Sequence, residues 1–191
     1  MIVVDYILIA AGILAAIYAA VRTVRAGRTY MAFRGKRLVS CPETHQPAAV
    51  RVAAGAAAAN TILGNPGIAL KECSRWPQRQ DCPQDCLSQI EEAPQACLVW
   101  NIMNRWYEGR DCVYCGKPFG EIHWHDHPPA LLSKEGKTVQ WNAIPPENLQ
   151  AALATHKAVC WSCHMAESFR REHPDLVLDR TVTPLRSNLY H

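Results

Sequence analysis

The chain has 191 residues, 49% of them hydrophobic, and a formal net charge of +3 at pH 7. After an N-terminal apolar segment, this length leaves room for one domain or two very small ones. The small net charge does not indicate a nucleic-acid partner, and we expect none. Nine cysteines are the main feature that an interpretation must explain.

The first predicted element is a transmembrane helix over residues 1–24. The stretch from Tyr6 to Val21 carries no charge, and apolar neighbours extend it to about 20 residues, which is the length that spans a bilayer core. A cleaved signal peptide fits less well, because the segment before the apolar run contains Asp5 and no basic residue. We therefore expect one uncleaved anchor that contacts membrane lipid.

Basic residues follow the apolar run, and residues 25–40 are predicted to form a juxtamembrane linker. The basic side chains are Arg22, Arg25, Arg28, Arg34, Lys36 and Arg37. The positive-inside rule places the N-terminus outside and the soluble part in the cytoplasm, as a single-pass membrane protein. A reducing cytoplasm disfavours structural disulfides and favours metal ligation by cysteine.

Residues 41–110 form the first cysteine-bearing region. Their pattern predicts a short strand, then an alanine-rich helix that ends at Gly64, and another short strand near residues 68–71. A helical turn is expected near residues 83–92, and a longer helix over residues 96–108.

Four cysteines of this region form a possible second metal site, namely Cys41, Cys73, Cys82 and Cys86. Zinc and an iron–sulfur cluster both accept four thiolates, so the identity of the metal stays open. Buried free thiols or disulfides are the alternatives. Cys97 would then be a buried thiol on the last helix, which we expect to pack by the face that carries Trp106.

Residues 111–175 form the second cysteine-bearing region, and residues 176–191 are expected to be an extended C-terminal arm. Cys112 and Cys115 precede Gly116 with the spacing of a zinc knuckle, in which glycine permits the positive φ of the turn. Cys160 and Cys163 open a helix-like run, and a helix N-terminus favours the thiolate form of cysteine. We expect one zinc site with four thiolates: Cys112, Cys115, Cys160 and Cys163.

A knuckle followed by a Cys-x-x-Cys pair at a helix start resembles the treble-clef zinc fold. The resemblance covers about a third of the chain. It implies a small, cysteine-rich, metal-stabilised domain with a treble-clef-like zinc site. Together with the predicted transmembrane helix, the expected fold class is α+β, with a single N-terminal span followed by this domain.

The sequence Cys160-Trp-Ser-Cys163-His164 is also the attachment pattern of a c-type haem, with His164 as the axial ligand. This alternative requires the opposite membrane orientation. It also leaves Cys112 and Cys115 without a role unless they form a disulfide.

Three histidines, His123, His125 and His127, alternate along the chain and would face one side of a strand. They could bind a metal, or they could orient the zinc site as hydrogen-bonding neighbours. We favour the second interpretation.

The order of Cys112/Cys115, Asp126-His127-Pro, Asn148-Leu149 and Cys160/Cys163-His164 resembles zinc-stabilised HNH endonucleases. That resemblance implies a divalent-metal phosphodiesterase site, with His127 as the general base and His164 as a metal ligand.

No phosphate-binding loop, nucleophile elbow or acid–base pair is visible, so no catalytic residue is assigned. The leading hypothesis is a membrane-anchored zinc protein that serves as an accessory or assembly subunit of a larger membrane complex. The alternatives are an electron-transfer protein with haem c or an iron–sulfur cluster, and an HNH-like nuclease.

Overall fold

The computed structural model describes residues 2–65, 67–76, 78–79 and 81–176. Its chain divides into two compact units. Unit 1 comprises Met1–Glu108 and Ile144–Ala154, and unit 2 comprises Gly109–Ala143 and Thr155–His191. Residues Ile144–Ala154 come from the second predicted cysteine region, yet they belong to unit 1.

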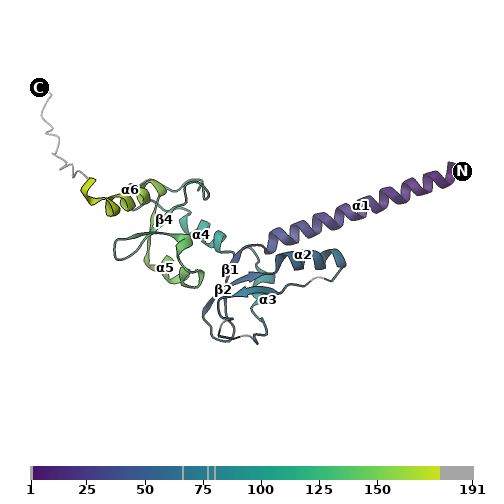
Figure 1. Ribbon diagram of the computed structural model, residues 1–191, viewed down its shortest axis with the longest axis horizontal. Helices are drawn as coiled ribbons and strands as arrows, with labels where there is room; N and C mark the ends of the chain where they lie inside the picture. Colours follow the sequence, from purple (N-terminus) through teal and green to yellow (C-terminus); the bar gives the residue numbers. More distant parts are fainter. Residues whose placement is uncertain (1, 66, 77, 80, 177–191) are drawn as a thin grey trace, which may run out of the picture. The chain divides into compact units, whose positions relative to one another are not determined.

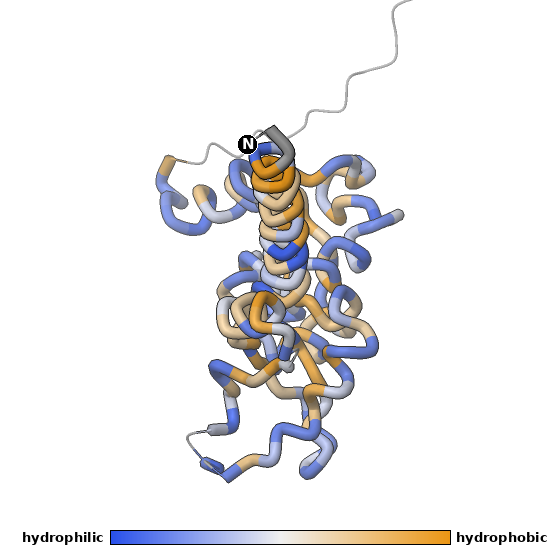
Figure 2. Tube along the Cα trace, turned by 90° about the vertical axis from the view of Figure 1, so that its right-hand side faces the viewer, coloured by the Kyte–Doolittle hydropathy of each residue, from blue (hydrophilic) through white to orange (hydrophobic). Residues whose placement is uncertain are grey.

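The N-terminal helix α1 spans Ile2–Phe33 (Figure 1). Its segment Val4–Phe33 has a mean hydropathy of 2.1 in its most apolar window, and none of that window is buried. Figure 2 shows apolar residues along its N-terminal turns. A membrane span and a signal sequence both have this length and composition, so the helix is a candidate membrane span.

Helix α2, Ala54–Leu63, packs beside the second half of α1 (Figure 1). Small side chains allow the two helices to approach closely, and Ala26 of α1 and Ala57 of α2 are both buried. The helix ends at Gly64 with a φ of 81°, as the sequence predicts, because a left-handed cap favours glycine. The guanidinium of Arg22 donates to the carbonyl oxygens of Thr61 at 3.1 Å and Ile62 at 2.9 Å. Arg22 thereby satisfies acceptors that a helix C-terminus leaves free.

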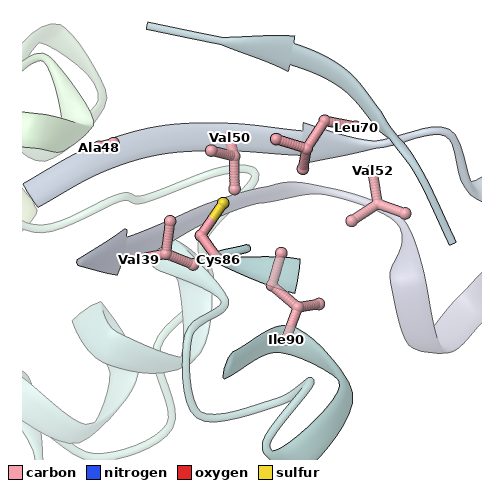
Figure 3. Close-up of a cluster of buried hydrophobic side chains, with 7 residues drawn as sticks. All are labelled: Val39, Ala48, Val50, Val52, Leu70, Cys86 and Ile90. Atoms are coloured by element: carbon pink, nitrogen blue, oxygen red, sulfur yellow. The ribbon is translucent and has the colours of Figure 1, made fainter. Parts of the chain in front are cut away.

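The core of unit 1 lies between an antiparallel sheet and a short helix. The sheet has the order β1-β2-β3, with β1 at Lys36–Ser40, β2 at Pro47–Val52 and β3 at Leu70–Cys73. Alternate residues of β2 are buried, as the period of a strand requires. Helix α3, Leu87–Glu92, places Ile90 against them with no exposed surface. Figure 3 shows the cluster, which contains Val39, Ala48, Val50, Val52, Leu70, Cys86 and Ile90.

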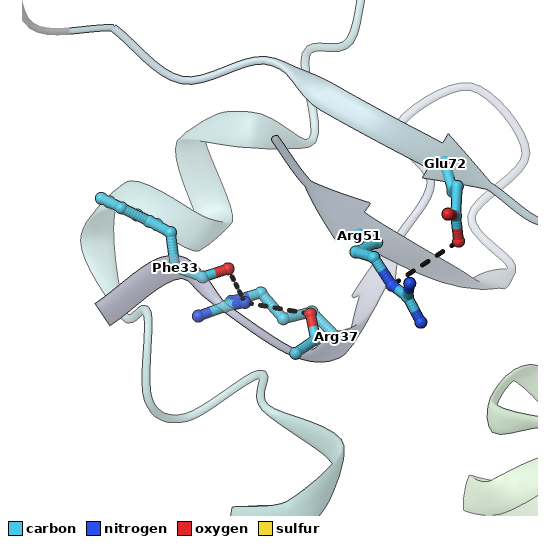
Figure 4. A network of polar contacts seen from close by, with 5 residues as sticks. Phe33, Arg37, Arg51 and Glu72 are labelled. Atoms are coloured by element: carbon cyan, nitrogen blue, oxygen red, sulfur yellow. Dashed lines mark hydrogen bonds and ion pairs between the residues drawn. The ribbon is translucent and has the colours of Figure 1, made fainter. Parts of the chain in front are cut away.

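Arg37 joins the end of α1 to the sheet, although it is fully buried. Its Nη1 donates to the carbonyl oxygens of Phe33 at 2.6 Å and Arg34 at 3.1 Å, and its Nη2 donates to Ala32 (Figure 4). A positive charge is favourable at a helix C-terminus. Burial lowers the pKa of Arg37. The segment predicted as a linker over residues 25–40 is therefore helix up to Phe33 and strand from Lys36.

A second arginine of the sheet is held much more loosely. Arg51 of β2 lies 3.6 Å from the Glu72 carboxylate of β3, and both side chains are substantially exposed (Figure 4). A pair of this kind contributes little to stability.

Helix α4, Val99–Tyr107, confirms the predicted helix over residues 96–108, but the predicted packing face is wrong. Its buried side chains are Val99, Met103 and Tyr107, which repeat every fourth residue. Trp106 is only half-buried, and its Nε1 donates to the carbonyl oxygen of Leu153 at 3.1 Å. The polar indole N–H requires a partner, which favours the edge of the core over its centre.

Cys97 lies just before α4 and not on its face. Its side chain is partly buried against the hydrophobic cluster of unit 1. Burial raises the pKa of its thiol.

Unit 2 combines a second antiparallel sheet with one longer helix. The sheet has the order β5-β4-β6, with β4 at Ala130–Leu132, β5 at Thr138–Gln140 and β6 at Lys157–Val159. Helix α6, Trp161–Glu172, follows β6 directly. The remaining helical segments of the described residues are η1 at Trp141–Ala143, η2 at Pro146–Asn148, α5 at Leu149–Thr155 and η3 at Pro174–Leu176. The mixture of helix and sheet is as predicted, and the expected C-terminal arm lies outside the described residues from 177 onward.

Candidate metal centre

Four thiols of unit 2 come together as the sequence predicts. The Sγ atoms of Cys112, Cys115, Cys160 and Cys163 all lie within 4.8 Å of one another. The Sγ atoms of Cys115 and Cys160 are 3.8 Å apart. A tetrahedral zinc site with Zn–S bonds of about 2.3 Å places its sulfur atoms about 3.8 Å apart. The cluster therefore has the dimensions of a site for a single metal ion.

The first pair of thiols sits in a tight turn. The N–H of Cys112 donates to the carbonyl oxygen of Lys117 at 2.9 Å, and the N–H of Gly116 donates to the carbonyl oxygen of Cys112 at 2.8 Å. Gly116 has a φ of 65°, which is the conformation predicted for the glycine of a knuckle. The turn holds both thiols on one side of the backbone.

The second pair of thiols sits at the start of α6. Cys160 is the N-cap residue, and Cys163 lies in the first turn. The N–H of Cys160 donates to the Sγ of Cys112 at 3.3 Å. The N–H of Val113 donates to the carbonyl oxygen of Ala158 in β6 at 3.0 Å. The sheet thus fixes the knuckle beside the helix start.

Burial raises the pKa of a thiol in this cluster, whereas hydrogen bonds from backbone N–H groups lower it. Burial tends to raise the pKa of Cys112, but the N–H groups of Cys160, Cys115 and Tyr114 outweigh it and lower the pKa to about 6. Burial and the neighbouring thiols raise the pKa of Cys163. Thiols this close cannot all ionise without a compensating charge, which a divalent cation supplies.

The three adjacent histidines do not form the strand that the alternation predicts. Residues 124–126 form a turn, and the N–H of His127 donates to the carbonyl oxygen of His123 at 2.8 Å. All three side chains are exposed. The His127 ring packs edge-on against the Trp161 ring, with 4.4 Å between the ring centroids. Among the described residues, no histidine joins a group of three potential ligands within 4.8 Å.

His164 is buried in unit 2 next to the metal centre. Its Nδ1 lies 2.9 Å from the Oγ1 of Thr138 in β5. This hydrogen bond ties α6 to the sheet and fixes the orientation of the imidazole. The sequence does not indicate the role of Thr138, because Thr138 and His164 are 26 residues apart and only the fold brings them together.

No protein-family model, curated protein or solved structure matches this chain. The metal centre is therefore defined by its own geometry, and the resemblance to treble-clef and HNH proteins remains a likeness of motifs.

The cysteines of the first region are arranged differently. Four of them line one cavity of about 340 Å³ in unit 1, namely Cys41, Cys73, Cys82 and Cys86. Their Sγ atoms do not all lie within 4.8 Å of one another, as those of the metal centre in unit 2 do. Burial, together with the other three thiols, raises the pKa of Cys86 to about 11. Hydrogen bonds from Thr44 lower the pKa of Cys41.

Proposed function

We propose that this protein is a membrane-anchored zinc-binding accessory subunit of a larger membrane complex, in which the metal is structural. The observation that carries the proposal is the set of four thiols within 4.8 Å in unit 2. Four protein ligands close the coordination sphere of zinc, whereas a catalytic zinc site keeps a position open for water or substrate.

The same cluster favours zinc over a c-type haem. Haem attachment would use Cys160 and Cys163 alone, but both lie within ligand distance of Cys112 and Cys115. An axial histidine must present its ring to the iron, and His164 is buried beside Thr138. A single ion shared by all four thiols accounts for each of these positions.

The composition and exposure of α1 support the membrane anchor. Large apolar side chains are exposed along the helix from Val4 to Val24. An unpartnered apolar surface of this length is stable in lipid and not in water. The basic residues that follow the span favour a cytoplasmic soluble part.

The end of α2 supports a close approach of unit 1 to the bilayer. Arg22, the first basic residue after the charge-free run, holds the last turn of α2 through two backbone carbonyls. At that end Ile62 is 49% exposed and Leu63 is 79% exposed. These side chains therefore lie near the level at which α1 leaves the apolar layer, where apolar groups are favoured.

Exposed apolar residues on unit 2 support a protein partner. The knuckle exposes Val113 and Tyr114, and α6 exposes Met165 and Phe169 one turn apart. Apolar side chains of this size on one small unit are typical of an interaction surface.

Two measurements test the proposal. Full-length protein purified in detergent should lack a Soret band and contain stoichiometric zinc, and protease should cleave its soluble part in inverted vesicles but not in intact cells. A Soret band, or cleavage only from outside the cell, would overturn the zinc assignment or the orientation.

The partner is tested separately by native electrophoresis of solubilised membranes. The wild-type chain should migrate in an assembly much larger than its 21.3 kDa. The double variant Met165→Ser/Phe169→Ser should be released from that assembly with its zinc retained. Ser162→Ala, at an exposed position of the same helix, is the control that should leave the assembly intact.

A further inference from the structure

We propose that unit 1 carries a second metal site, in which Cys41, Cys73, Cys82 and Cys86 bind a thiophilic metal through their sulfur atoms. The site is separate from the metal centre of unit 2, and it does not depend on the proposed role in a complex.

The first observation is that the turn at Cys41 repeats the knuckle at Cys112. The N–H of Cys41 donates to the carbonyl oxygen of Gln46 at 2.9 Å, and the N–H of His45 donates to the carbonyl oxygen of Cys41 at 2.8 Å. The corresponding bonds at Cys112 join the same relative positions with the same lengths, 2.9 and 2.8 Å. The two turns therefore share the same backbone hydrogen bonds around their first residue.

The backbone of His45 strengthens the likeness. His45 has a φ of 53°, close to the 65° of Gly116 at the matching position. A left-handed conformation is unfavourable for a residue with a Cβ, and such residues gather at functional turns. The sequence does not reveal this knuckle, because Thr44 stands where the other turn has Cys115.

The second observation is that three more thiols converge on this turn. Cys73 ends β3, whereas Cys82 and Cys86 lie in the segment before α3. All of them line the same cavity as Cys41. Cys86 is only 6% exposed, and its sulfur points toward Val50 of β2 (Figure 3). Cysteines far apart in the sequence thus line one cavity.

The spacing of these thiols sets the condition for binding. Their Sγ atoms are too widely spread for one ion as they stand, but a change between staggered rotamers moves a thiol within the cavity without moving the backbone. To bind a single zinc ion, the thiols must move closer together. An iron–sulfur cluster is larger than one ion, so the thiols need to move less to bind it. Thiolate ligation is common to both.

Charged side chains of both signs line the cavity, because Glu43 and Asp85 lie there as well as two arginines. Arg75 and Arg79 line it together with the thiols, and Arg79 forms an ion pair with Glu43. Four thiolates around a divalent ion carry a net negative charge, which the guanidinium of Arg75 would partly offset.

The metal content of the full-length chain, purified under reducing and anaerobic conditions in detergent, tests this proposal. The wild-type chain should hold metal at two sites, and Cys73→Ser should lose the second while it keeps the zinc of unit 2. Cys97→Ser is the matched control, because Cys97 packs against the same core and should leave both sites occupied. A brown colour identifies a cluster, and a colourless protein with two zinc ions identifies zinc. Metal at one site in the wild type, unchanged by Cys73→Ser, would overturn the proposal.

Thiol alkylation of the wild-type chain gives a second test that needs no variant. Cys41, Cys73, Cys82 and Cys86 should react severalfold more slowly before treatment with a chelator than after it, whereas the rate at Cys97 should not change. Equal rates at all four before and after treatment would contradict the second site. Protection of Cys112 and Cys115 reports on the metal centre of unit 2 separately, so the two sites can fail independently.

Discussion

The two units hold their thiols in opposite ways. Unit 2 has a small core, in which Cys112, Ala130 and Val159 form one buried cluster with Cys160 and Cys163 packed against it, and Leu131 and Ala158 are buried as well. Unit 1 buries seven residues between a sheet and α3, and its thiols surround a cavity at the edge of that core. Small domains with few buried residues depend on cross-links or metals. If both proposed sites bind metal, the metal would replace the core in unit 2 and supplement it in unit 1.

Metal removal should produce the largest difference between the units. Structural zinc contributes about 10–16 kcal/mol of apparent binding free energy in small zinc domains, which exceeds the stability of most small domains. Chelation under reducing conditions should therefore unfold unit 2 and leave the sheet of unit 1 folded.

Hydrogen exchange read peptide by peptide measures this difference. Peptides from residues 155–172 should lose protection after chelation, whereas peptides from residues 36–52 should keep it. Loss of protection in both units to the same extent would show that the folding of unit 1 depends on metal as much as that of unit 2.

Replacement of Arg37 should have the next largest effect, and it should act on unit 1. Arg37→Met leaves several carbonyl oxygens at the end of α1 without their charged donor, and we expect a loss of about 3 kcal/mol. Urea unfolding in detergent, followed by circular dichroism, measures the change.

Arg51→Met is the control for Arg37→Met. Arg51 pairs with Glu72 at the exposed surface of the sheet, so its removal should cost less than about 1 kcal/mol. Equal losses for the two variants would show that the buried guanidinium does not hold the end of α1 to the sheet of unit 1.

Alkaline pH should weaken unit 1 through Tyr107. Burial raises the pKa of its hydroxyl above the ordinary value, so the folded state favours the neutral form. The stabilisation is fully present below about pH 10, the ordinary pKa of tyrosine, and is lost as the unfolded chain ionises above it. Tyr107→Phe should reduce the loss of stability between about pH 10 and 12. An unchanged pH profile of unfolding in the variant would show that Tyr107 is not the group responsible.

The smallest expected effect concerns the two turns. Gly116→Ala places a Cβ at a φ of 65°, which should cost about 1 kcal/mol and weaken zinc binding about fivefold. Gly120→Ala, at a position with open space and no positive φ, should change neither, as measured by competition with a chromophoric chelator. His45→Gly should be tolerated by unit 1, because glycine relieves the strain at that position.

The sequence predicts the elements and thiols that depend on local patterns. The Cys-x-x-Cys pairs, the glycine of the knuckle and the alternation in β2 all act over a few residues, and each is found where the pattern places it. The length of α1 was underestimated, because hydropathy marks only its apolar part and not the basic turns that continue it.

Features that depend on contacts between residues distant in the sequence could not be predicted from local patterns. The prediction of the packing face of α4 was wrong. Both faces of the helix carry apolar side chains, and the indole N–H of Trp106 donates to the carbonyl oxygen of Leu153 on α5. The histidine alternation at residues 123–127 matches a strand, but no partner strand pairs with it among the described residues. The sequence does not predict the turn at Cys41, because Thr44 stands in place of a second cysteine and His45 in place of the glycine.

X-ray absorption at the zinc edge determines whether four thiolates close the metal centre of unit 2. It should be measured on full-length Cys73→Ser protein, so that only the metal centre of unit 2 contributes to the signal. The expected result is a first shell of four sulfur atoms at about 2.3 Å, supplied by Cys112, Cys115, Cys160 and Cys163. A first shell that contains nitrogen or oxygen, or a protein that carries haem iron in place of zinc, would contradict a closed four-thiolate site.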